Sequence, residues 1–167
     1  MDMDYSTVAL LVAALALAVA LVALFRKNTP PPPPPAPNNS LPLQLTAYER
    51  LVLLCERISL PALISRTAAA DLGASDMRYV LVENIKQEFD YNASQQIYVS
   101  DAAWGAVRNL RDQTLLVINQ VAGTLPPEAR ASDLNKKLLE VMLQQEGTAL
   151  HTAALETLNS EAKKIMR

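Results

Sequence analysis

The sequence is poor in the residues on which most catalytic and metal sites depend. Among its 167 residues there are one cysteine, Cys55, one histidine, His151, and only four glycines, none of them close together. A single cysteine excludes an internal disulfide, and a single histidine leaves no cluster of the kind that binds zinc. Scattered glycines exclude a phosphate-binding loop. The sequence therefore predicts no catalytic residue, no metal, no cofactor and no small-molecule ligand.

The chain also lacks an excess of either charge. It has 15 basic and 17 acidic residues, a net charge of −2, whereas a nucleic-acid-binding domain usually presents a basic surface. We expect no nucleic-acid partner. Cys55 falls on an apolar stripe and is expected to be an inert core thiol, and His151 is expected to be a solvated or capping histidine on the last helix.

One long apolar run is present near the start of the chain. Residues Thr7–Phe25, TVALLVAALALAVALVALF, contain no charge, amide or proline. A helix of that length spans about 28 Å, close to the hydrocarbon core of a bilayer at about 30 Å. The run therefore predicts a transmembrane anchor, with residues 1–27 as the N-terminal tail and span.

The flanks of the run predict its orientation. The first six residues, MDMDYS, carry no Lys or Arg, whereas a secretory signal peptide has a positive n-region; Ala16 and Ala18 still resemble a cleavage site, so removal of the run stays an alternative. Arg26 and Lys27 are the only basic residues near either end. The positive-inside rule then predicts an outside N-terminus and a cytoplasmic C-terminal domain.

Small residues recur regularly within the predicted span. The spacings alternate between four and three, the period of left-handed helix packing, and such a seam lets two helices approach closely in lipid. The alternative is an alanine-rich anchor whose spacing is accidental. The candidate transmembrane interface consists of Ala9, Ala13, Ala16, Ala20 and Ala23.

A proline-rich linker follows at 28–40. Six consecutive prolines, Pro30–Pro35, and Pro37 favour polyproline II, which rises about 3.1 Å per residue. Eight such residues would hold the following domain roughly 25 Å from the membrane. A PxxP ligand is the alternative, and a stiff spacer is the preferred interpretation.

Residues 41–167 are predicted to form an all-α bundle of four or five helices. The apolar residues recur at helical spacing, and Leu115–Ile118 is apolar all round the helix, which favours a core helix buried on several sides. Candidate caps separate the helices. These caps are Thr46 in a capping box with Glu49, Ser75, Ser100, Ser132 and Thr148, with Pro61 starting a short extra turn.

Two polar patterns stand out within this domain. Glu49-Arg50 and Glu56-Arg57 repeat seven residues apart, so they share one helix face, which predicts a solvated or salt-bridged surface. The segment 91–104 combines amides and aromatics between two helices and suits either partner docking or a structured connection that satisfies helix ends. The candidate partner-docking residues are Tyr91, Asn92, Ser94, Gln95, Gln96 and Tyr98.

Two strings carry a resemblance to a known family. LPLQLTAYERLVLLCERI (41–58) and EFDYNASQQIYVSDAAW (88–104) resemble uncharacterised single-span membrane proteins of Bacteroidetes-group bacteria, over about residues 41–143. The resemblance implies a short N-terminal anchor and a cytoplasmic helical domain in a bacterial inner membrane. It implies no catalytic residues, and the linkers of that family tend to be charged rather than proline-rich.

The expected function is therefore a membrane-tethered helical interaction module, a scaffold or accessory subunit of an inner-membrane complex. Its expected partners are the lipid bilayer and either another protein or a second copy of the chain. The alternative is a membrane-anchored, hydrolase-like enzyme that uses the region 83–104, with carboxylates Glu83, Glu88 and Asp90.

Overall fold

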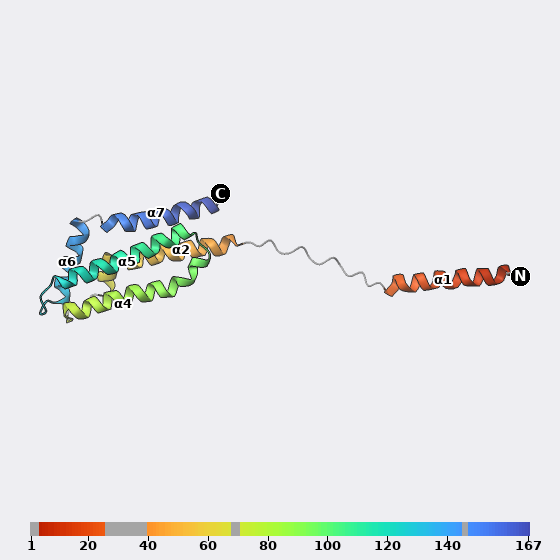
Figure 1. The fold of residues 1–167 in the computed structure, drawn as a ribbon, viewed down its shortest axis with the longest axis horizontal. Helices are drawn as coiled ribbons and strands as arrows, with labels where there is room; N and C mark the ends of the chain where they lie inside the picture. Colours follow the sequence, from red (N-terminus) through yellow and green to blue (C-terminus); the bar gives the residue numbers. More distant parts are fainter. Residues whose placement is uncertain (1–3, 26–39, 68–70, 145–146) are drawn as a thin grey trace. The chain divides into compact units, whose positions relative to one another are not determined.

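The computed structural model describes residues 4–25, 40–67, 71–144 and 147–167, and these residues form helices joined by turns (Figure 1). The all-α helical bundle predicted from the sequence is confirmed, and the described residues contain no β-strand. The elements are α1 (Tyr5–Phe25), α2 (Leu41–Ile58), α3 (Leu60–Thr67), α4 (Ala74–Asn92), the 3₁₀-helix η1 (Ala93–Ile97), α5 (Asp101–Gly123), α6 (Ala131–Gln144) and α7 (Gly147–Ile165).

The chain divides into two units, Met1–Asn38 and Asn39–Arg167. In the first unit, α1 is a continuous apolar helix and, within the described ranges, the one helix long and apolar enough to cross a membrane. The predicted polyproline spacer, Pro30–Pro35 with Pro37, and the basic pair Arg26-Lys27 lie outside the described residues.

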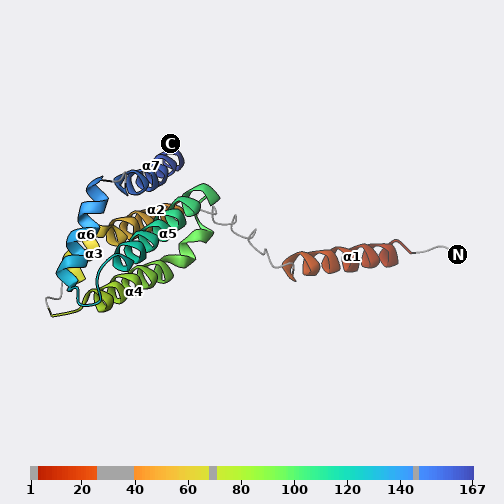
Figure 2. The same ribbon diagram turned by 60° about the vertical axis from the view of Figure 1, so that its left-hand side comes forward.

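In the second unit, α2, α4, α5 and α7 lie side by side and α6 crosses one end of them (Figures 1 and 2). α2 packs against α4, α5 and α7, while α5 packs against α4 and α7. The side chains between them are apolar and fully buried, as expected from helices with one apolar face. Those buried residues include Leu51, Leu54, Ile58, Met77, Leu81, Ile85, Val107, Ile118 and Leu158.

Cys55 belongs to this core. Its side chain is fully buried, and burial raises the pKa of the thiol to about 12. A thiol that stays protonated and covered is a weak nucleophile. The position fits the interpretation of Cys55 as an inert core residue.

The prediction that α5 is covered on several sides is wrong at one position. Ile118 is fully buried, but Leu116 is 46% exposed. Leu116 and Ile118 are two residues apart, so they point in directions about 200° apart on the helix. The neighbours of α5 leave the side that carries Leu116 open to solvent.

Several predicted helix starts are also wrong. α2 begins at Leu41, with Pro42 in its first turn where the missing N–H costs nothing, so Thr46 lies inside the helix rather than capping it. α4 begins after Gly73 instead of Ser75. Its first amide, from Ala74, donates a 2.9 Å hydrogen bond to the carbonyl of Ala129. A loop distant in sequence therefore provides an acceptor for the free amides at the start of α4, the role expected of a serine cap.

Of the later helix starts, one has the predicted cap and two differ from the prediction. Ser100 is confirmed as the cap of α5, because its Oγ accepts a 3.0 Å hydrogen bond from the Ala103 amide. α6 begins at Ala131, and Asp133, not Ser132, accepts the Arg130 amide over 2.9 Å. α7 begins at Gly147, so Thr148 lies within it rather than before it.

His151 does not lie on a solvated face. It is on the first turns of α7, half-buried, with Nε2 3.5 Å from Oε2 of Glu56 on α2. The expectation of a solvated histidine is wrong because the side of α7 that carries His151 faces α2. His151 therefore contributes to the contact between these two helices.

Candidate partner-docking site

The candidate docking residues of the segment 91–98 do not form one surface. Tyr91, Ser94, Gln96 and Tyr98 are exposed, whereas Asn92 and Gln95 are buried. Asn92 ends α4 and Gln95 lies on η1, and their burial fits a structured interhelix connection. The exposed members lie on the surface, and their role in partner docking stays a prediction. Sequence analysis missed Ile97, which is 74% exposed on η1.

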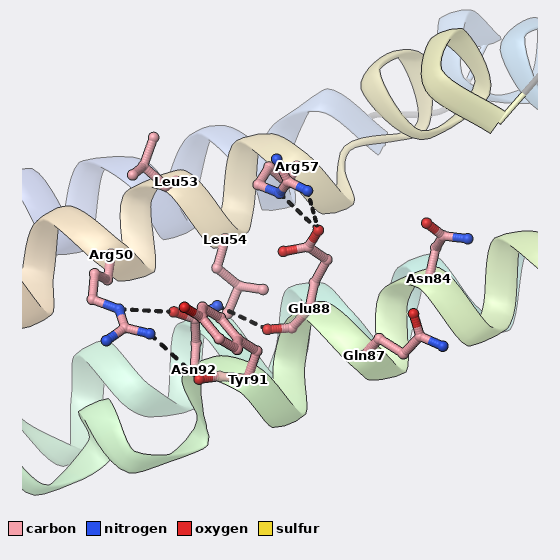
Figure 3. Close-up of a pocket in the computed structure, with 9 residues that line it drawn as sticks. All are labelled: Arg50, Leu53, Leu54, Arg57, Asn84, Gln87, Glu88, Tyr91 and Asn92. Atoms are coloured by element: carbon pink, nitrogen blue, oxygen red, sulfur yellow. Dashed lines mark hydrogen bonds and ion pairs between the residues drawn. The ribbon is translucent and has the colours of Figure 1, made fainter.

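A groove of about 470 Å³ lies beside this segment, between α2 and α4 (Figure 3). The two helices run antiparallel here, because Arg50 contacts Asn92 while Arg57 contacts Glu88. Only Tyr91 and Asn92 among the predicted docking residues line it. The complete lining consists of Arg50, Leu53, Leu54, Arg57, Asn84, Gln87, Glu88, Tyr91 and Asn92.

Arg50 is held at one end of the groove by neutral partners. Its Nε donates to Oδ1 of Asn92 over 3.3 Å, and its Nη2 donates to the backbone oxygen of Tyr91 over 3.4 Å. Its guanidinium carbon lies 5.1 Å from the centre of the Tyr91 ring, within cation–π range. Asn92 is fixed in turn, because its Nδ2 donates to the Glu88 carbonyl over 2.8 Å. Among the described residues, no carboxylate pairs with Arg50.

The charge of Arg57, at the other end of the groove, is balanced by a carboxylate. Its Nε donates to Oε1 of Glu88 over 2.7 Å, and the two side chains point towards one another across the groove (Figure 3). The hydrogen bond that Arg57 donates to Glu88 raises the pKa of the Arg57 guanidinium. Arg66 on α3 also lies 3.6 Å from Glu88. Two arginines thus share one carboxylate, and Arg50 is a third arginine beside the groove, in a domain that has 13 basic and 15 acidic residues over 41–167.

The groove also has an apolar part. Leu54 forms its floor and is buried, while Leu53 stands at its rim and is 55% exposed. Tyr91 is 76% exposed. Arginine and tyrosine are the residue types that most often dominate binding energy in protein interfaces. The arrangement can bind a ligand that combines an apolar face with a negative charge.

The three carboxylates of the enzyme alternative, Glu83, Glu88 and Asp90, have different surroundings. Glu83 accepts a 2.8 Å hydrogen bond from Lys86, which raises the pKa of that lysine, and Glu88 is bound to Arg57. Asp90 is exposed on α4. Within the described ranges no group of three His, Cys, Asp or Glu side chains is placed to hold a metal ion. Glu83 and Glu88 thus each have a basic partner of their own, and the enzyme alternative stays a hypothesis.

The five alanines of the predicted transmembrane interface all lie on α1. In a continuous helix, positions 9, 13, 16, 20 and 23 fall within an arc of about 80°. Ala14 and Ala18 lie on the opposite side by the same geometry. Figure 1 shows α1 as one uninterrupted helix, so the seam forms a single stripe along it.

The seven-residue spacing identified Arg50 and Arg57 on one face of α2, but as part of a solvated or salt-bridged surface rather than a docking site. The sequence had no signal that Asn92 and Glu88 would meet that face. Those pairs join residues 42 and 31 positions apart, and their contact depends on how α2 and α4 pack.

Comparison with known proteins agrees with the resemblance on one point, that the chain belongs to an uncharacterised family. A profile described as "Family of unknown function (DUF7935)" matches residues 5–165, from α1 to the end of α7. No curated protein and no solved structure matches the chain. The match includes the apolar helix as well as the helical domain.

Proposed function

Because the chain belongs to DUF7935, a family of unknown function, we propose its role from its own geometry: it is a membrane-tethered helical interaction module. It serves as a scaffold or accessory subunit of a bacterial inner-membrane complex. The partner binds in the groove between α2 and α4, beside Arg50, Leu53 and Tyr91.

The observation that carries this proposal is an open groove between two helices of the bundle. α7 packs against both α2 and α5 and fills the groove between them. α3 packs against both α2 and α4, but it is only eight residues long and lies at the Arg57 end, where Arg66 approaches Glu88. None of the described residues covers the rest of the α2–α4 groove, where Leu53 and Tyr91 line it and are exposed.

The apolar helix α1 supports the tether. We propose that it spans the inner membrane with the N-terminus outside, so that the basic pair after Phe25 and the helical domain are cytoplasmic. Tethering to the same membrane as the partner raises the effective concentration of the groove. A module of moderate affinity can then stay bound through a modest interface.

A photo-crosslinking experiment tests the docking role. The full-length chain is expressed in its native membranes with a photo-crosslinking amino acid in place of Leu53, and in parallel in place of Leu116. Both leucines are about half exposed, on α2 and α5 respectively, and Leu116 does not line the groove. We expect a discrete protein adduct from position 53 that the Tyr91→Ala substitution weakens. No adduct at position 53, or the same adducts at both positions, would contradict the docking role.

A further inference from the structure

We propose that the occupant of the α2–α4 groove is a short amphipathic helix of the partner protein, which places a carboxylate against Arg50 and an aliphatic side chain against Leu53. This inference rests on the proposed docking function and specifies the chemistry of the ligand. Three properties of the groove support it: its shape, its charge and its length.

The shape of the groove suits a helix. Two neighbouring helices leave a channel in which a third helix packs ridge into groove. This fold already uses such a channel, because α7 lies against both α2 and α5 and buries Ala154 and Leu158 completely there. An amphipathic helix laid against α2 and α4 would repeat that packing with Leu53 and Leu54 beneath it.

The charge of the groove selects an acidic ligand. Arg57 and Arg66 share the carboxylate of Glu88, whereas the contacts of Arg50 are the Asn92 amide oxygen, the Tyr91 carbonyl and the Tyr91 ring. These contacts fix the guanidinium in position without cancelling its charge. A carboxylate binds such a fixed guanidinium with little further ordering, and charge-assisted hydrogen bonds are the stronger kind.

The length of the groove limits the ligand. Arg50 and Arg57 are seven residues apart on α2, which corresponds to about 10 Å or two helical turns. Beyond Arg57 the groove ends at α3, whose Arg66 lies 3.6 Å from Glu88. The bound face is therefore about two to three turns long, with its acidic residue near the end that lies beside Tyr91.

A selection experiment identifies the ligand chemistry directly. The probe is a phage library in which one face of a helix, carried on a stable helical hairpin, is randomised. The library is selected on the full-length chain in detergent micelles, with no counter-selection on any variant of the groove. We expect the surviving helices to carry Asp or Glu next to Leu, Ile or Met at i,i+3 or i,i+4 spacing.

Affinity measurements with the selected helices then use matched variants. Arg50→Gln and Tyr91→Ala should each weaken binding by about tenfold or more, and added salt should weaken it further. Arg108→Gln and Tyr79→Ala are the controls, an exposed arginine on α5 and an exposed tyrosine on α4 that lie outside the groove, and they should leave the affinity unchanged. Thermal unfolding followed by circular dichroism establishes that all four variants remain folded.

The outcomes separate this inference from the docking function. Selected helices that are basic or uncharged, or that bind the Arg50→Gln chain equally well, would overturn the acidic-helix inference. If position 53 still forms a protein adduct in membranes in that case, docking stands and only the ligand chemistry is wrong. If acidic helices bind through Arg50 but position 53 captures nothing in membranes, the groove chemistry stands and the proposed docking role fails.

Discussion

The hydroxyl of Tyr48 on α2 donates a 2.7 Å hydrogen bond to Oε2 of Glu161 on α7, 113 residues further along the chain. The same carboxylate oxygen accepts a 2.6 Å hydrogen bond from Oγ of Ser100, the residue that caps α5. Glu161 therefore connects the last helix to both helices that form its groove. These polar contacts lie at the edge of the apolar contact made by Leu158, and together they attach α7 to the bundle.

Removing the Tyr48 hydroxyl should loosen this attachment. We expect Tyr48→Phe to lower the free energy of unfolding by about 1 kcal/mol, because Glu161 loses one donor but keeps Ser100. Urea unfolding followed by circular dichroism measures the change. Tyr79→Phe is the control, since Tyr79 is 63% exposed, and it should change the stability by less than about 0.5 kcal/mol. Equal effects in the two variants would contradict a role for the Glu161 contact.

The helical domain should lose stability in alkaline solution. Burial, followed by the hydrogen bond to Glu161, raises the pKa of Tyr48 above 10.0, and burial raises that of Cys55 from 9.0 to about 12. Both side chains hold their proton more tightly in the folded state than in the unfolded state. Their contribution to the free energy of unfolding is therefore fully present below the pKa of the unfolded state, and it is lost as pH rises through the pKa of the folded state.

Urea unfolding measured across the alkaline range tests this dependence. The free energy of unfolding should begin to fall above pH 9.0, where unfolded Cys55 ionises, and should fall more steeply above pH 10.0, where unfolded Tyr48 joins it. Tyr48→Phe should flatten the steeper part. An unchanged slope in that variant would show that Tyr48 does not carry the effect.

Two nearby residues of α5 should differ strongly in their contribution to stability. Ile118→Ala should cost about 2–4 kcal/mol, because a fully buried side chain is replaced by a cavity. Leu116→Ala should cost far less, since Leu116 is 46% exposed. Chemical denaturation of both variants measures the difference. Similar losses would mean that the exposed side of α5 is covered in solution.

The orientation of the anchor is testable with a reporter. An alkaline phosphatase fused after Arg167 is active only when it reaches the periplasm. We expect the fusion to be inactive, because Arg26 and Lys27 favour the cytoplasm for the C-terminal side. A green fluorescent protein fused at the same position should fluoresce. Strong phosphatase activity would reverse the proposed orientation.

The alanine stripe of α1 makes a prediction about assembly. We expect Leu at Ala13, Ala16 and Ala20 to weaken crosslinked or detergent-resistant complexes, because larger side chains prevent close approach of two helices while insertion stays favourable. Leu at Ala14 and Ala18, on the opposite side, should have less effect. If neither set changes any complex, the stripe reflects composition alone.

Much of the fold could be predicted from the sequence, because apolar spacing and capping are local properties. The helical period indicated α2, α4, α5, α6 and α7, and Ser100 was identified correctly as a cap since its bond to Ala103 spans three residues. The serine and threonine caps that failed were equally plausible locally. At the start of α4, for example, the carbonyl of Ala129 takes the role expected of Ser75.

The candidate site was only partly predictable for the same reason. The sequence determined that Arg50 and Arg57 share a face of α2, and that the end of α4 carries an aromatic and an amide residue. Only the packing of α2 against α4 decided that Arg57 meets Glu88 while Arg50 meets the neutral Asn92. Such pairing depends on the rotation and offset of two helices. Both are set by the summed packing of many buried side chains, which no local pattern specifies.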